Sequence, residues 1–381
     1  MKRWLAYLRD TDGRLQKGVL LAFILVCCGL FPLAAQAIPG VRFPSLDSHF
    51  TKSRDTLRIF VIGDVMMHQA QIDADYEPFF RYIRPEMEKA DICIANMEFS
   101  LGGEPYSGYP AFSAPDAFAR YVKDCGVDVF LIANNHITDR GMAGLRRTVS
   151  FYRDSLQIPY AGVDDEPLML VRKGIRLGLV NFTYGTNNRL KTREPHISLM
   201  REEGIHNAVD SARRAGADFL IALPHWGEEY VLTHSQQQEK FARFLVSEGF
   251  DAVVGAHPHV VQDTAHISSV PIIYSLGNAV SNMSAVNTRL SLAVTLQFVI
   301  DRTRVNGSGV SSGGSGLQLR MLEPQLRWMW CTLPGRLTHS YATIFVDEWI
   351  GRRDEWHLPS DYENMVATLR RVQQACTPQP R

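Results

Sequence analysis

Short apolar segments with the length of buried β-strands recur along this sequence and alternate with segments that have helical periodicity. The strand-like segments are Leu57–Ile62, Ile92–Ala95, Val127–Ala133, Asp218–Leu223, Asp251–Gly255 and Pro271–Tyr274. The helix-like segments, which place apolar residues three and four positions apart, are Pro115–Cys125, Gly141–Leu156, Gly204–Ala215 and Ser235–Glu248. This alternation predicts an α/β fold with a largely parallel sheet covered by helices.

Two further patterns depart from simple alternation. Leu168–Val171 and Ile175–Phe182 flank a Lys-Gly pair, which predicts a β-hairpin that turns at Gly174. The stretch from Tyr362 to Ala375 has the periodicity of an amphipathic helix and is expected to close the fold.

The amino-terminal segment has the three parts of an export signal. Basic residues come first, an apolar run extends from Val19 to Ala35, and Ala35-Gln36-Ala37 supplies the small residues of a cleavage site. The apolar run is also long enough for an uncleaved membrane anchor, which stays the alternative. We therefore expect an exported protein, periplasmic or at the cell surface, that lies close to a membrane.

These features divide the chain into four parts, with one internal loop. We expect a signal peptide or uncleaved anchor at 1–37, an extended leader at 38–56, one domain at 57–350, and a C-terminal helix and tail at 351–381. Within the domain, Ser291–Val305 and Leu317–Trp330 are predicted as long strands that flank a flexible Gly- and Ser-rich loop at 306–316.

The charge of the chain excludes one class of partner. There are 40 Lys and Arg residues against 40 Asp and Glu residues, so the formal net charge is zero. No basic cluster is interleaved with aromatic residues. We therefore expect no nucleic-acid partner.

Polar residues that can bind a metal follow five of the predicted strands. They are Asp64 with His68, Asn96 with Glu98, Asn134-Asn135-His136, His225 with Glu228 and Glu229, and His257 with His259. Ligands bind at the carboxyl ends of the strands in α/β sheets, so these side chains are expected to meet there. Carboxylate, amide and imidazole groups suit zinc, manganese or iron, and a carboxylate can bridge two ions. The pattern therefore predicts a divalent-metal site.

Taken one at a time, these residues also have ordinary structural explanations. Asp64 could cap the helix that follows it, His68 could be a half-buried histidine, and Asn134–His136 could be turn residues. His257 and His259 are the hardest to explain in that way, because alternate residues of an extended segment face the same side.

Together, the motifs resemble those of the bacterial capsule-synthesis family CapA, also called poly-γ-glutamate biosynthesis protein or PGA_cap. The matching strings are Gly63-Asp64-Val65-Met66, Ala95-Asn96-Met97-Glu98, Ala133-Asn134-Asn135-His136, His225-Trp226-Gly227-Glu228-Glu229-Tyr230, Gly255-Ala256-His257-Pro258-His259-Val260-Val261-Gln262 and Tyr274-Ser275-Leu276-Gly277-Asn278. The family has a variant of the calcineurin-like metallophosphatase fold. The resemblance therefore implies a single domain folded as a four-layer α/β/β/α sandwich, with metals at one edge of its sheets.

Carried over position by position, the resemblance also implies roles for individual residues. One metal ion would be surrounded by Asp64, Glu98 and His259, the other by Asn135, His225 and His257, and Glu98 would bridge the two. His136 would face the substrate and protonate a leaving oxygen. Glu228 or Glu229 would orient His225 or act on the substrate. Further candidates are His68, Asn96 and Asn278.

Two departures from the metallophosphatase pattern affect the first of these ions. The usual Asp-x-His becomes Asp64-Val65-Met66, with His68 four residues after Asp64. The usual Gly-Asp-x-x-Asp becomes Asn96-Met97-Glu98. Because both departures affect the same ion, the chain is expected to hold either two ions of manganese, zinc or iron, or only one.

The resemblance implies an exported, metal-dependent hydrolase-like protein that serves the assembly, export or trimming of an anionic surface polymer such as poly-γ-glutamate. Its partner would be the polymer or the synthase complex of that polymer. A non-catalytic, membrane-associated accessory subunit of a polymer synthase is the alternative, which the altered motifs favour. A secreted metallophosphoesterase is a third hypothesis.

Overall fold

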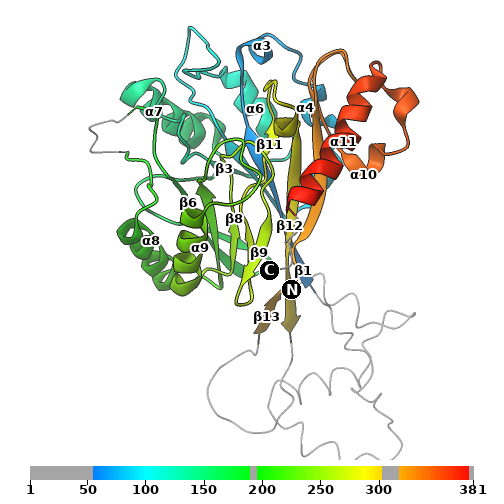
Figure 1. Ribbon diagram of the computed structural model, residues 1–381. Coiled ribbons are helices and arrows are strands. Elements are labelled where there is room, and N and C mark those ends of the chain that lie inside the picture. The colour runs from blue at the N-terminus through cyan, green and yellow to red at the C-terminus, as the bar shows by residue number, and fades with distance from the viewer. Residues whose placement is uncertain (1–54, 189–194, 303–316, 377–381) are drawn as a thin grey trace, which may run out of the picture. The chain divides into compact units, whose positions relative to one another are not determined.

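Two β-sheets pack face to face in this protein, and helices cover their outer faces (Figure 1). The computed structural model describes residues 55–188, 195–302 and 317–376. The strands of the first sheet are β1 (Asp55–Val65), β2 (Ile92–Met97), β3 (Val129–Leu131), β4 (Tyr160–Ala161), β11 (Asn278–Val280), β12 (Leu290–Arg302), β13 (Leu317–Met321), β14 (Gln325–Thr332) and β15 (Ala342–Phe345). The strands of the second sheet are β5 (Leu168–Arg172), β6 (Ile175–Thr183), β7 (Phe219–His225), β8 (Ala252–Val254), β9 (Thr264–Ile267) and β10 (Val270–Ile273).

The helices connect these strands and close the chain. The α-helices are α3 (Gln69–Ile72), α4 (Pro78–Arg81), α5 (Arg84–Lys89), α6 (Asp116–Asp124), α7 (Gly141–Ser150), α8 (Glu202–Arg214), α9 (Gln236–Glu248), α10 (Val346–Trp349) and α11 (Pro359–Cys376). The other helical segments are the π-helix η2 (Phe151–Leu156) and the 3₁₀-helices η3 (Val286–Arg289) and η4 (Arg353–Glu355).

The second sheet is parallel at its centre and antiparallel at both margins, whereas the first sheet is parallel on one side and antiparallel on the other. The first runs in the order β15-β14-β12-β1-β2-β3-β4, and the second in the order β5-β6-β7-β8-β10-β9. Strands β1 to β4 are mutually parallel, as are β6, β7, β8 and β10. In each sheet the carboxyl ends of the parallel strands therefore lie at one edge.

Three apolar cores separate the four layers of the molecule. In β7, Phe219, Ile221 and Leu223 face the core between the two sheets, whereas Leu220 and Ala222 face the core shared with α8 and α9. Successive side chains of a strand point to opposite faces, so both faces of β7 are buried. In β1 the same alternation separates the central core from the core shared with α4 to α7. The expected α/β/β/α sandwich is confirmed.

The six predicted strands and four predicted helices are present, with ends shifted by a few residues. The predicted hairpin is confirmed as β5–β6, in which Arg172 pairs with Ile175. Its two turn residues, Lys173 and Gly174, have φ values of 50° and 81°. Positive φ at both central residues is the geometry of the tight turns that match the twist of a hairpin.

The prediction of one long strand over Leu317–Trp330 is wrong. Two strands, β13 and β14, occupy this stretch, and both pair with β12 in antiparallel fashion. The interruption includes Pro324, which has no backbone N–H to donate to the sheet. The predicted helix Gly141–Leu156 also differs in detail, because its last six residues form the π-helix η2.

Several predicted segments lie outside the described residues. They are the signal or anchor at 1–37, the leader up to residue 54, the Gly- and Ser-rich loop at 306–316, and the end of the tail. Within the described part of the chain, no helix combines the length and the apolar character that crossing a membrane requires.

A buried ion pair attaches the last helix to the first sheet. The guanidinium of Arg289 donates to both carboxylate oxygens of Asp361 in α11, at 2.6 Å each, and to the carbonyl oxygen of Cys331 at 2.9 Å. The Arg289 guanidinium also lies over the ring of Trp330, 4.4 Å from the ring centre. Arg289 is 6% exposed and Asp361 is 1% exposed. Helix α11 is therefore an integral part of the domain.

We predict that Arg289→Ala lowers the free energy of unfolding by about 3–5 kcal/mol, because the substitution leaves the Asp361 carboxylate buried without its cation. Urea denaturation followed by far-UV circular dichroism measures this change. Arg353→Ala is the matched control, since Arg353 pairs with Glu363 at an exposed position and its loss should change stability little. Equal effects of the two substitutions would contradict the prediction.

Candidate metal centre

The carboxyl ends of strands from both sheets bring the predicted metal ligands together. Asp64 lies near the end of β1, and Glu98 directly follows β2. Asn135 follows β3, and His225 is the last residue of β7. His257 and His259 lie in the loop after β8, and Asn278 begins β11. All seven side chains are almost completely buried.

Close backbone approach fixes the position of Asp64. The backbone N–H of Asp64 donates to the carbonyl oxygen of Gly277 at 3.0 Å. A Cβ atom at Gly63 would lie 1.9 Å from that same oxygen, so only glycine fits there. The carboxylate of Asp64 accepts from the Asn96 amide at 2.7 Å and from the backbone N–H of His257 at 3.2 Å. Asp64 is therefore not a helix cap, and His68 occupies the N-cap of α3 instead.

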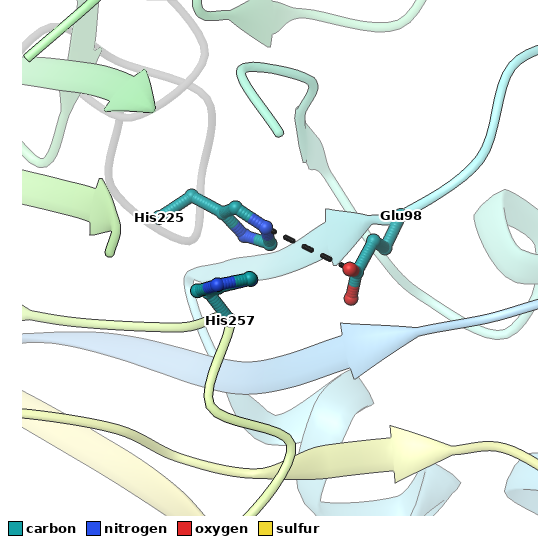
Figure 2. Close-up of side chains that lie close together, drawn as sticks. All are labelled: Glu98, His225 and His257. Carbon is teal, nitrogen blue, oxygen red and sulfur yellow. Dashed lines mark ion pairs between the residues drawn. The ribbon is translucent and has the colours of Figure 1, made fainter. Parts of the chain in front are cut away.

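Glu98 carries the central carboxylate of the cluster. Its side chain is 0% exposed, and neither carboxylate oxygen accepts a hydrogen bond from the described residues. Oε1 lies 3.6 Å from Nε2 of His225, and Oε2 lies 3.7 Å from Nδ1 of His259. Figure 2 shows the carboxylate directed toward His225, with the ring of His257 beside that imidazole. A buried carboxylate without donors is costly unless a cation neutralises it, so this arrangement fits a bound metal.

Two groups of ligand atoms share Glu98. One is Asp64, Glu98 and His259, and the other is Glu98, His225 and His257. Within each group the ligand atoms lie within 4.8 Å of one another. Oδ1 of Asn135 extends the second group, since it lies 2.9 Å from Nε2 of His225. The geometry thus places Glu98 where a bridging ligand between two ions would be.

The loop that carries His257 and His259 is not extended, contrary to expectation. His257 has a φ of 101° and His259 has a φ of 57°. Left-handed backbone at a residue other than glycine costs about 1–3 kcal/mol and concentrates at functional sites. The two imidazoles nevertheless reach the same cluster, with ring centres 5.9 Å apart.

Burial keeps two of the candidate ligands neutral. It lowers the pKa of His257 to about 3 and the pKa of His225 well below its usual value. Neutral imidazoles have the free lone pair that a metal ion requires. Burial likewise lowers the pKa of His68 to about 4.

The group around Glu98 and His259 retains an extra proton when no metal is bound. Burial raises the pKa of the Glu98 carboxyl well above its usual value. Burial alone would lower the pKa of His259, but the charges of Glu98 and Asp64 outweigh it and raise that pKa to about 10. The proton belongs to the coupled group rather than to either residue alone. A metal ion would have to displace it.

His136 lies beside the cluster and is held by a carboxylate that sequence reasoning missed. Nδ1 of His136 lies 2.7 Å from Oδ2 of Asp139, which also accepts the backbone N–H of Phe112 at 2.8 Å. A carboxylate can only accept, so Nδ1 carries the proton and Nε2 has the free lone pair. The contact could have been predicted from the sequence, because a spacing of three residues places His136 and Asp139 on one turn of the chain.

The other predicted residues take different places. Asn96, rather than Glu228 or Glu229, contacts His225, with its amide nitrogen 3.1 Å from Nδ1 of the imidazole. Glu228 is exposed. Glu229 is half-exposed, and its Oε1 lies 3.9 Å from Nε2 of His259.

His68 belongs to neither of the groups centred on Glu98. Its Nδ1 lies 3.2 Å from the backbone N–H of Asn282 and 3.1 Å from the Gln71 side chain. Asn278 contacts Nδ1 of His259 at 3.0 Å through its side-chain oxygen. Asn278 therefore holds His259 in place from the side of β11.

Two packed sheets with outer helices, and a cluster of carboxylate, amide and imidazole groups at their carboxyl edges, define an α/β sandwich protein with a candidate metal centre. The chain belongs to the family described as bacterial capsule synthesis protein PGA_cap, whose family model matches residues 58–283. The resemblance expected from the motifs is confirmed.

Curated relatives agree with this family. The capsule biosynthesis protein CapA of Bacillus anthracis is 29% identical over 280 residues, which are 68% of this chain and 67% of that protein. The PGA biosynthesis protein CapA of Bacillus subtilis is 27% identical over 280 residues, which are 68% of this chain and 71% of that protein. Among solved structures, the NAD nucleotidase NadN of Haemophilus influenzae is 12% identical and covers 73% of this chain and 52% of its own, with a TM-score of 0.39.

We predict that Glu98→Gln weakens Mn²⁺ binding by at least about 100-fold, because it removes the charge shared by both groups. The same change should raise the urea stability of the metal-free protein, since a neutral amide is less costly to bury than the proton-sharing carboxylate that it replaces. Isothermal titration calorimetry and urea denaturation measure the two effects. Glu203→Gln, at an exposed position of α8, is the control. Unchanged affinity together with lowered stability would show that Glu98 is structural.

We predict that the metal-free protein loses stability as the pH rises from about 7 toward 10. The folded state holds a proton through His259 that the unfolded state has already released above about pH 6.5, so the free energy of unfolding falls across this window. The slope due to one such proton is at most about 1.4 kcal/mol per pH unit. Urea denaturation in a chelating buffer should show a flatter pH profile for His259→Gln than for wild type. Parallel profiles would contradict the prediction.

Proposed function

We propose that this chain is a metal-dependent, hydrolase-like protein that serves the assembly, export or trimming of an anionic surface polymer, with poly-γ-glutamate as the leading candidate. The observation that carries the proposal is the Glu98 carboxylate, buried without donors between imidazoles from different strands. The family description and the printed names of the two Bacillus relatives support the choice of polymer.

A cavity beside the cluster provides room for a substrate. Its volume is 690 Å³, and Asn135, His136 and His259 contribute to its wall. The wall also includes the half-exposed Glu229 and Tyr230. Groups that would bind a metal and a group that could transfer a proton thus face the same space.

Asp64, Glu98 and His259 would hold one divalent ion, and Glu98, Asn135, His225 and His257 the other. Ions bound there would polarise the oxygen of a scissile phosphoryl or acyl group and activate a water molecule.

His136 would supply the proton that the leaving group needs. Because Asp139 fixes the proton on Nδ1, Nε2 is the nitrogen that can take a proton from the cavity and return it to the departing atom. Asp139 also stabilises the imidazolium that forms in between. Tyr184 packs against His257, with ring centres 4.6 Å apart, and shields the buried imidazoles from water.

Export and a membrane-proximal partner complete the proposal. The basic and apolar amino-terminal segment ending at Ala37 supports export to the periplasm or cell surface, as a cleaved or an anchored protein. The synthase complex of the polymer is the proposed macromolecular partner.

A non-catalytic accessory role is the second candidate. Met66, which is 2% exposed and lines the cavity, stands where the metallophosphatase pattern has a histidine. A thioether is a poor ligand for manganese, so the first ion would have fewer strong protein ligands than the second. This observation favours a chain that binds the polymer without cutting it.

We predict that the full-length, Mn²⁺-loaded chain hydrolyses poly-γ-glutamate, and that His136→Gln lowers kcat by about 10²–10⁴-fold while metal binding is retained. Asp139→Asn should lower kcat and shift its pH profile, since it alters the proton-bearing imidazole. Release of free amines measures the reaction. His206→Gln, at an exposed site on α8, is the matched control. A wild-type chain that binds the polymer but never cleaves it would favour the accessory role, and cleavage of nucleotides or phosphodiesters instead would favour a phosphoesterase.

A further inference from the structure

The wall of the cavity beside the metal centre includes the carboxylate of Glu229 and, among the described lining residues, no lysine or arginine. The positive charge of this cavity would come from the ions that the cluster holds. Those ions would act on the reacting group of the polymer. The carboxylates of further residues of a long acidic polymer would need a cation on a neighbouring surface.

A second, smaller cavity adjoins the first. It has a volume of 290 Å³ and shares Tyr230 and Ala285 with the larger one. The rest of its wall comes from Val260, η3 and Arg371 of α11. Tyr230, at the boundary, is 49% exposed and has a left-handed backbone with a φ of 69°. A chain-like ligand longer than the first cavity would pass Tyr230 into the second.

Arg371 gives this second cavity a cation without an acidic partner. Its guanidinium donates to the side-chain oxygen of Asn287, at 2.6 Å from Nη2, and to the hydroxyl of Thr368 at 3.2 Å. Both acceptors are neutral, and no ion pair joins Arg371 to a carboxylate within the described residues. By contrast, Arg352 and Arg353, close to α11 in sequence, each pair with a glutamate.

The second cavity is firmly connected to the metal centre. The backbone oxygen of Thr288, in its wall, accepts from the side chain of Asn278, which in turn contacts His259. The buried pair of Arg289 and Asp361 fixes α11 against the same segment. The helix that carries Arg371 is therefore fixed relative to the proposed reaction centre.

We propose that the cavity at Arg371 is a binding subsite for a side-chain carboxylate of an acidic polyamide whose neighbouring residues occupy the larger cavity. This inference rests on the proposed function, since it assumes that the polymer enters the metal-centre cavity. A guanidinium presents parallel N–H donors that match a carboxylate, and the neutral ligands of Arg371 can yield to one. The subsite selects long, charged chains over short or neutral ones.

The test compares the affinities of fluorescein-labelled γ-glutamyl oligomers for the full-length, Mn²⁺-loaded chain in mild detergent. Arg371→Gln should weaken binding of a decamer by about tenfold or more, which corresponds to about 1.4 kcal/mol. The same substitution should not change the affinity for a γ-glutamyl dimer, which fits the larger cavity alone. It should also not change the affinity for a neutral γ-glutaminyl decamer. Arg371→Lys, which keeps the charge but not the two parallel N–H donors, should lose less decamer affinity than Arg371→Gln and more than the Arg370 control.

Arg370→Gln is the matched control, because Arg370 is exposed on the same helix and lies outside both cavities. Equal decamer affinities of the Arg370 and Arg371 variants would overturn the subsite. A similar loss of affinity for the dimer, the decamer and the neutral oligomer would also overturn the subsite, since the Arg371 substitution would then act through the fold. If the wild-type chain bound none of the oligomers, the proposed function itself would be wrong. This result can be told apart from the two results that overturn only the subsite, because in those the wild-type chain still binds the decamer.

Discussion

The buried carboxylates of Asp64 and Glu98 are the constraint on which the rest of the structure depends. Two acidic groups at 0% exposure are tolerated only where cations or donors surround them. Asp64 has its donors in Asn96 and the His257 backbone. Glu98 lies between His225, which burial keeps neutral, and His259, through which the metal-free group holds a proton. The metal-free fold thus holds a shared proton among these buried groups, and a divalent ion bound there would take its place.

Much of this centre could be predicted from the sequence, because polar residues at the ends of apolar strands conflict with simple burial. Asp64, Glu98, His225, His257 and His259 were all recognised in that way, and parallel strands do bring them together. The geometry inside the cluster could not be predicted. The left-handed backbone of His257 and His259 and the contact of Asn96 with His225 depend on tertiary packing that local patterns do not encode.

The fold could be predicted from the sequence to a similar extent. The prediction was wrong or incomplete where tertiary contacts decide the structure. The alternation of strands and helices predicted the parallel strands of both sheets, since both faces of strands such as β7 are apolar. The break between β13 and β14 at Pro324 was missed, because hydrophobicity continues across it. The role of α11 was also hidden, since Arg289 and Asp361 are 72 positions apart and each looks like an ordinary surface residue in the sequence.

The order of these parts along the chain has a consequence for biosynthesis. The candidate ligands extend from residue 64 to residue 259, and the helix that braces their surroundings ends only at Cys376. The ribosome must therefore have synthesised the chain through residue 259 before all the candidate ligands are present, and through Cys376 before α11 can brace them. An unfolded precursor would have no such cluster. The compartment in which the chain folds would then supply the metal ion, and its free-metal pool would decide which element the centre binds.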